Sequence, residues 1–184
     1  NFAAVWNAPV VFIVQNNQFA ISVPLAMQTK SINIAVKGIA YNIDSLLVDG
    51  NDFFAMHEAL SFAREHAVSG KGPFLIEART YRAGAHTTSD DPSKYRSKEE
   101  EAHWAEKDPL KRLKGYIKHA GLDALNDEEQ LIKQFKKHID SEFEAAEKHP
   151  EYPLEDVFGY MYDEMPDELK RQKNNYENYL RGAK

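Results

Sequence analysis

The feature that most constrains the fold of this chain is the apolar run PVVFIV at residues 9–14. It is rich in Val and Ile, it begins at a proline, and it contains no polar side chain. This pattern is typical of a strand that is covered on both faces in a parallel sheet. The run stops at three consecutive amides, Gln15, Asn16 and Asn17. The sequence therefore predicts a buried strand whose carboxyl end carries polar groups.

Two further apolar runs predict two more strands, over residues 45–50 (SLLVDG) and 74–81 (FLIEARTY). A helix is predicted between them, because Asp52 is suited to cap a helix running to about Ser69 and GKGP at residues 70–73 is suited to end it. Strand, helix and strand in succession form a βαβ unit. The expected fold class is therefore α/β, with a mostly parallel sheet.

The carboxyl ends of the predicted strands are where we expect a functional site, since ligands of parallel sheets gather at that edge. Asn16 and Asn17 follow the first strand, and the segment from Arg82 to His86 follows the third. We therefore expect the two segments to share one site. Amide oxygens are hard ligands suited to Mg²⁺ or Ca²⁺. Taken alone, however, asparagines after a strand more often only satisfy a turn.

The remainder of the chain is predicted to be a loop followed by helices. The stretch at 84–96 (GAHTTSDDPSKYR) is small and polar and predicts an exposed loop. Ser97 and Glu100 have the spacing of a capping box, and Asp108 before a proline predicts a second helix start. A third helix is expected over 126–148. Its apolar stripe consists of Leu131, Ile132, Phe135, Ile139 and Phe143.

These patterns divide the chain into two predicted parts. Residues 1–96 are expected to form the α/β domain, and residues 97–184 a helical extension that packs on it and on partner subunits. Residues 152–184 mix aromatic and charged side chains, which favours a docking surface for a partner subunit over a free tail.

Composition excludes several classes of function. The formal net charge of -6 gives no basic surface for nucleic acid. No apolar run of about 18 residues exists, so no membrane span is predicted. The chain has no cysteine, which excludes disulfides and thiolate metal sites and is consistent with a reducing cytoplasm. We expect a cytoplasmic protein.

The opening string NFAAVWNAPVVFIVQNNQFAIS resembles the second half of the cofactor motif in alpha subunits of thiamin-diphosphate-dependent 2-oxo-acid dehydrogenases. In that family the motif begins with Gly-Asp-Gly, whose aspartate binds the metal. Here the chain starts at Asn1 within the closing half, so we expect the carboxyl-terminal half of such a subunit. The strings VDGND, SGKGP, TYRAGAHTTSDDPSKYR and KDPL extend the resemblance. It implies part of a thiamin-diphosphate-binding fold.

The resemblance also implies roles for residues after the first strand. The side chain of Asn17 and the backbone carbonyl of Phe19 would ligate Mg²⁺, which bridges the diphosphate oxygens of thiamin diphosphate. A divalent cation suits this position because it offsets the charge of two adjacent phosphates. Ile21 matches a bulky apolar position that holds the cofactor bent, and its alternative role is ordinary core packing.

His86 matches a catalytic histidine that contacts cofactor-bound intermediates and assists acyl transfer, although a loop histidine is usually only solvated. Its reference pKa near 6.5 suits proton transfer close to neutrality. Arg82, Asp90, Tyr95 and Arg96 match positions that order this loop over the active-site entrance.

The implied activity is oxidative decarboxylation of a 2-oxo acid, with acyl transfer to lipoyl groups on an acyltransferase core. Pyruvate is the preferred substrate on overall resemblance, and branched-chain 2-oxo acids and acetoin remain alternatives. The implied assembly is an alpha2-beta2 heterotetramer, in which the beta subunit supplies the activating glutamate. The competing hypothesis is that this segment alone is an inactive structural or subunit-docking module.

Overall fold

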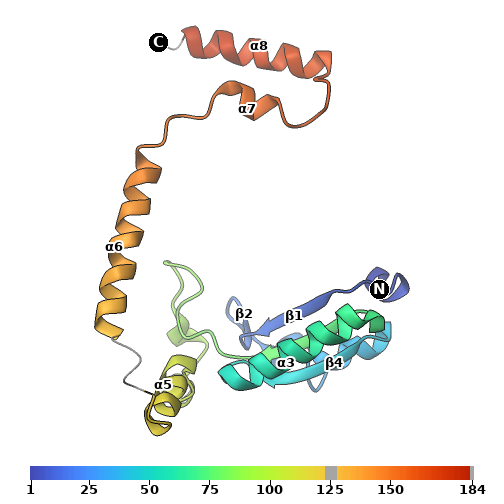
Figure 1. Cartoon of the computed structure of the whole chain (residues 1–184), viewed down its shortest axis with the longest axis vertical. Coiled ribbons are helices and arrows are strands. Elements are labelled where there is room, and N and C mark those ends of the chain that lie inside the picture. Colours follow the sequence, from blue (N-terminus) through green and yellow to red (C-terminus); the bar gives the residue numbers. More distant parts are fainter. Residues whose placement is uncertain (123–127, 183–184) are drawn as a thin grey trace. The chain divides into compact units, whose positions relative to one another are not determined.

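The computed structural model describes residues 1–122 and 128–182, and the chain divides into two compact units, residues 1–124 and 125–184. The first unit contains the sheet, and the second is helical over its described residues (Figure 1). The helices and strands of the first unit are α1 (Phe2–Val5), β1 (Val11–Asn16), β2 (Phe19–Ala20), β3 (Val23–Pro24), α2 (Leu25–Gln28), η1 (Ala35–Tyr41), β4 (Asp44–Asp49), α3 (Phe53–His66), η2 (Ala67–Lys71), β5 (Phe74–Arg79), η3 (Pro92–Lys94), α4 (Lys98–Ala105) and α5 (Pro109–His119). Those of the second are α6 (Glu128–Glu147), α7 (Leu154–Phe158) and α8 (Asp167–Gly182).

The main sheet has three parallel strands in the order β1-β5-β4. Val11 of β1 and Asp44 of β4 both pair with Phe74 at the start of β5, so the three carboxyl ends meet at one edge. β4, α3 and β5 form the predicted βαβ unit. The α/β class with a parallel sheet is confirmed. Within the described residues, no helix is both long and apolar enough to cross a membrane.

The first strand differs from its prediction in two ways. β1 begins at Val11 rather than at Pro9, and it continues through Asn16, whose side chain is buried. The expectation that it is covered on both faces is wrong for this chain, since Phe12 and Ile13 are 41% and 54% exposed. The reason is that the covering helix α3 packs mainly on β5 and β4, which leaves much of β1 uncovered.

The core lies between α3 and one face of the sheet. Ala59 and Ala63 of α3 pack against Phe74 and Ile76 of β5, and their small side chains let the helix approach the strands closely. The predicted cap of α3 is confirmed, because the Asp52 carboxylate accepts hydrogen bonds from the next turn at 3.0 Å. Figure 1 shows α3 lying along the sheet.

The two predicted helix starts after the loop are also confirmed. The Ser97 hydroxyl accepts from the Glu100 amide at the start of α4, and Asp108 accepts from the Lys111 amide at the start of α5. Arg112 of α5 donates to the carboxylates of Asp49 and Asp52 at 2.8 and 2.6 Å, respectively. These ion pairs fix α5 beside the carboxyl end of β4.

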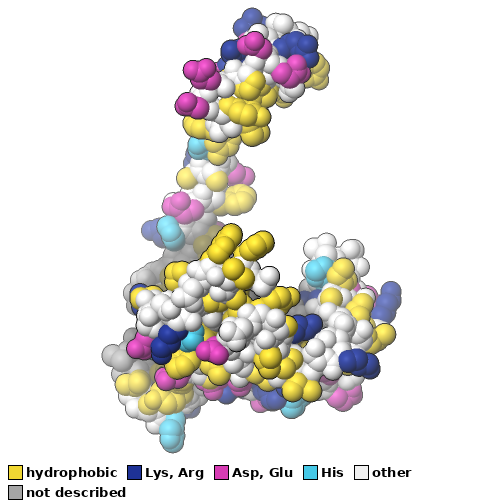
Figure 2. Space-filling view, turned by 90° about the vertical axis from the view of Figure 1, so that its right-hand side faces the viewer, with side chains coloured by type: hydrophobic (Ala, Val, Ile, Leu, Met, Phe, Trp, Pro, Cys, Tyr) yellow, Lys and Arg dark blue, Asp and Glu magenta, His cyan; other side chains and the backbone are white. Residues whose placement is uncertain are grey.

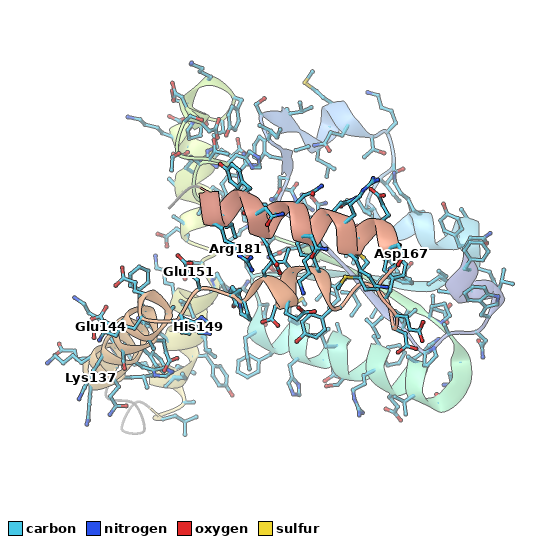
Figure 3. All side chains as sticks on the ribbon, turned by 90° about the horizontal axis from the view of Figure 1, so that it is seen from above. Lys137, Glu144, His149, Glu151, Asp167 and Arg181 are labelled. Carbon is cyan, nitrogen blue, oxygen red and sulfur yellow. The ribbon has the colours of Figure 1, made fainter. Side chains whose placement is uncertain are left out.

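The helix α6 of the second unit leaves its apolar side chains exposed. No side chain of α6 is buried, and the predicted stripe lies on its surface, with Phe135 and Phe143 56% and 65% exposed. α7 and α8 are joined by an ion pair between Glu155 and Lys173. Figure 2 shows exposed hydrophobic side chains on this unit, and Figure 3 labels Lys137 on α6 among its polar side chains.

Candidate functional site

The two segments that we expected to share a site meet at the carboxyl edge of the sheet. The amide of Thr80 donates to the Asn16 carbonyl at 2.9 Å, and the amide of Arg82 donates to the Asn17 carbonyl at 3.3 Å. The pairing of β1 with β5 therefore continues past both strand ends and aligns the asparagine doublet with the start of the histidine-bearing loop. The expected proximity of the two segments is confirmed, and their sharing of one functional site stays a prediction.

The two asparagines of the doublet have different surroundings. The Asn16 side chain is buried, donates through Nδ2 to Glu77 at 2.6 Å and accepts through Oδ1 from the Gln18 amide at 3.1 Å. Asn17 is only half-buried, and its Oδ1 accepts from the Phe19 amide at 3.1 Å. The Asn17 side chain therefore stabilises the turn. Its Oδ1 has a second lone pair that can accept a hydrogen bond or ligate a cation.

The turn leads into the short hairpin of β2 and β3, and its tip is strained. Ile21 has a φ of 55°, in the left-handed region that a β-branched residue rarely occupies. Its side chain is 59% exposed, so the alternative of ordinary core packing does not hold in this chain. Strained, exposed apolar residues of this kind tend to occur at ligand-binding sites.

A series of hydrogen bonds ties the loop to this hairpin. The Arg82 guanidinium donates to the Ile21 carbonyl at 2.5 Å and to the Tyr95 hydroxyl at 3.0 Å. The Tyr95 hydroxyl donates a hydrogen bond to the Asp90 carboxylate at 2.5 Å. The same carboxylate accepts a hydrogen bond from the backbone amide of His86 at 2.9 Å. The hairpin, the strand end and the loop are therefore held as one network.

The electrostatics of the network follow from these bonds. The hydrogen bond from Tyr95, and next the one from the His86 amide, lowers the pKa of Asp90. The same Asp90 carboxylate raises the pKa of Tyr95, because it accepts the hydroxyl proton. The His86 side chain itself is exposed, and Asp90 holds the backbone of His86 rather than its ring.

Arg96 anchors the other end of the loop. Its side chain is buried, and its guanidinium donates to the carbonyls of Arg82, Ala83 and Gly84 at 2.5, 3.0 and 3.2 Å. Glu101 of α4 lies 2.6 Å from its Nε and balances its charge. A buried guanidinium that donates hydrogen bonds to three consecutive carbonyls fixes the backbone of the loop where it leaves β5.

Aromatic packing supports the same region. The Phe19 ring lies 5.9 Å from the ring of Tyr81 and 5.6 Å from that of Tyr95, and the Arg82 guanidinium lies 5.6 Å from the Phe19 ring centre. Three side chains therefore pack near the ring of Phe19, the residue whose carbonyl is a candidate ligand.

A model of the family described as "Dehydrogenase E1 component" matches residues 1–155. The chain belongs to this dehydrogenase E1 family.

Individual members of the dehydrogenase E1 family resemble the chain over nearly all of its length. The pyruvate dehydrogenase E1 component subunit alpha of Acholeplasma laidlawii is 44% identical over 100% of this chain and 54% of the relative. Its Bacillus subtilis counterpart is 41% identical over 96% of the chain and 48% of the relative. A 3-methyl-2-oxobutanoate dehydrogenase subunit alpha of Mycobacterium tuberculosis is 44% identical over 94% and 47%. The chain therefore spans about half the length of these relatives, and its assignment to their carboxyl-terminal half stays a prediction.

The oxygens at this turn are the groups that could bind a divalent cation. Among the described residues, no cluster of three or more His, Cys, Asp or Glu side chains could hold a metal. The oxygens at the turn are neutral, the Asn17 amide and the Phe19 carbonyl, and hard neutral oxygens suit Mg²⁺. They fit as two neutral members of a coordination shell.

Sequence reasoning missed one residue at this edge, Glu77. It lies in the middle of β5 with 1% of its surface exposed, and its carboxylate accepts three hydrogen bonds. A carboxylate within the otherwise apolar stretch FLIEA at residues 74–78 was the available signal, since a buried carboxylate needs partners.

Proposed function

We propose that this chain is part of the alpha subunit of a 2-oxo-acid dehydrogenase and helps to bind Mg²⁺ and thiamin diphosphate. The observation that carries the proposal is the network of Arg82, Tyr95 and Asp90, which joins the turn after β1 to the His86 loop. Two segments with separate implied roles are thereby held together, in a chain of the dehydrogenase E1 family.

In this proposal the turn supplies cofactor contacts. The Asn17 amide oxygen and the Phe19 carbonyl oxygen act as Mg²⁺ ligands, and the exposed Ile21 side chain supports the cofactor. Thiamin diphosphate, which this family uses, supplies when bound the electron sink that a 2-oxo acid needs to lose carbon dioxide. The contribution of the chain is to orient these groups on a rigid strand end.

The His86 ring acts in the proposal as a proton donor or acceptor at the entrance of the site. Its exposure leaves both ring nitrogens accessible, while the bond from its amide to Asp90 fixes the position of its backbone. We assign it to acyl transfer to a lipoyl group, which has to enter from solvent. Arg82, Asp90, Tyr95 and Arg96 hold the loop in place for this step.

Substrate and partners are proposed from the relatives. We put pyruvate first, and a branched-chain 2-oxo acid is the second candidate because a 3-methyl-2-oxobutanoate dehydrogenase subunit is equally similar, at 44% identity. The proposed partners are a beta subunit, in an alpha2-beta2 assembly, and a lipoyl-bearing acyltransferase core. The proposed site of action is the bacterial cytoplasm.

Decarboxylation by the full-length protein with its beta partner tests this function. Pyruvate and 3-methyl-2-oxobutanoate are compared by kcat/KM, with thiamin diphosphate and Mg²⁺ present. His86→Ala is expected to slow acylation of a lipoyl acceptor at least 100-fold, with decarboxylation measured separately by an artificial electron acceptor. If the wild-type pair neither binds thiamin diphosphate nor turns over either acid, the enzyme proposal is wrong and the docking-module hypothesis is favoured.

A further inference from the structure

Glu77 is a buried carboxylate with no assigned role. It points to the sheet face opposite α3, because its neighbours in β5, Ile76 and Ala78, belong to the buried face toward the helix. One oxygen accepts from Asn16 Nδ2 at 2.6 Å. The other accepts from the backbone amides of Ile34 and Ala35, at 2.6 and 2.8 Å, where η1 begins.

We propose that Glu77 is a positioning residue that sets the geometry of the turn after β1, and through it the cofactor ligands. The inference rests on the proposed function, since it concerns the same site. Its structural basis is a sequence of contacts that runs from the carboxylate to the turn.

The first contact fixes the orientation of an amide. Because the Glu77 oxygen accepts from Asn16 Nδ2, the Asn16 Oδ1 must face the Gln18 amide, from which it accepts at 3.1 Å. The Gln18 side chain in turn donates to the Asn16 carbonyl at 3.2 Å. The first of these two bonds depends on the orientation of the Asn16 amide, and the second goes to the backbone. The Asn17 side chain and the Phe19 carbonyl follow directly on this backbone.

A carboxylate is required because three N–H groups point at its two oxygens. An ionised carboxylate accepts at both, whereas an amide accepts at one and donates at the other. Glu77→Gln keeps an acceptor for the Ile34 and Ala35 amides but sets an NH₂ group against Asn16 Nδ2. Rotating the Asn16 amide would relieve that conflict and would create a new one with the Gln18 amide. The variant therefore disturbs the turn while sparing the contact to η1.

The same reasoning predicts a rescue by exchanging the two functional groups. In Glu77→Gln combined with Asn16→Asp, the aspartate accepts both from Gln at 77 and from the Gln18 amide, so every donor has an acceptor again. Asn16→Asp alone places two carboxylates at the distance of a hydrogen bond. This single variant is therefore expected to bind the cofactor more weakly than either the wild type or the double variant.

The test is the dissociation constant of Mg²⁺-thiamin diphosphate, measured by calorimetry on the full-length protein with its beta partner. Glu77→Gln is expected to weaken binding about 10- to 100-fold, as loss of a supporting contact behind metal ligands does. The double variant is expected to return to within about threefold of wild type. The control is Glu58→Gln on the exposed surface of α3, which should bind like wild type. Circular dichroism melts confirm that each variant is folded at the temperature used.

Two results would overturn the inference while leaving the proposed function intact: wild-type affinity in Glu77→Gln, or a double variant as weak as Glu77→Gln. A purely structural Glu77 gives the first of these, with a lowered melting temperature and unchanged affinity in the folded fraction. If Glu77→Gln does not fold, recovery of binding in the double variant supports the inference and its absence overturns it. A wild-type pair that binds no cofactor overturns the proposed function and this inference together.

Discussion

At the scale of single residues, one carboxylate joins two parts of the loop. Asp90 accepts the hydroxyl of Tyr95 and the amide of His86, and these bonds lower its pKa. A group whose pKa is lowered on folding contributes stability above its unfolded pKa, near 3.9, and loses that contribution as the pH falls through the folded pKa. The loop is therefore expected to stay ordered through neutral and mildly acidic pH.

Hydrogen exchange at the His86 amide tests this prediction. Asp90→Asn is expected to lower the protection of that amide about fivefold at pH 7, because the acceptor becomes a weaker neutral oxygen. The control is Asp91→Asn, whose carboxylate instead caps Ser93. In the wild type, protection corrected for the intrinsic rate should decline only below about pH 4. Equal protection in Asp90→Asn and wild type, or a wild-type decline near pH 6, contradicts the assignment.

The members of this loop network could be predicted from the sequence, and the buried support behind the turn could not. Arg82, Asp90 and Tyr95 lie in one continuous string that resembles the family, so local sequence was enough to select them. Glu77 bonds to groups 42 to 61 residues away, and which backbone amides would reach it depends on how the segment before β4 folds over the sheet.

At the scale of elements, two glycines predict opposite effects of one substitution. A Cβ at Gly50, which follows β4, would lie 2.9 Å from the Arg79 carbonyl oxygen, whereas a Cβ at Gly115, within α5, would meet nothing within 4 Å. Gly50→Ala is expected to destabilise by about 1–3 kcal/mol through this overlap. Gly115→Ala is expected to stabilise by about 0.5–1 kcal/mol through helix propensity. Thermal melts should move in opposite directions, and shifts of the same sign would contradict this account.

Elements with local signals were predicted well, while their exposure was not. The caps at Asp52, Ser97 and Asp108 were placed correctly because each depends on residues within one turn. The exposure of Phe12 depends instead on which elements pack over β1, and a run of apolar residues has the same pattern whether or not its strand is covered. The division at residues 96 and 97 stays a prediction, and the first compact unit includes α4 and α5.

At the scale of the whole molecule, the exposed stripe of α6 predicts an interaction with the beta subunit. Phe135 and Phe143 are more than half exposed, so replacing them should leave the fold unchanged. Phe135→Glu and Phe143→Glu are each expected to weaken association with the beta subunit about thirtyfold, as at an interface hot spot. Sedimentation of the mixed subunits measures this. Lys137→Glu, on the polar side of the same helix, is the control, and equal association of all variants would contradict the prediction.

The most direct test of the central claim is the affinity of the full-length protein, with its beta partner, for Mg²⁺-thiamin diphosphate after a change at Asn17. We predict that Asn17→Ala weakens binding at least tenfold, since an oxygen ligand is lost, and that Asn17→Asp, which keeps an oxygen there, retains most of it. Asn7→Ala at the opposite edge of the sheet removes a 2.8 Å hydrogen bond to Gly70 and should bind like wild type. Undiminished binding by Asn17→Ala would contradict the claim that this turn supplies a ligand to the cofactor's metal.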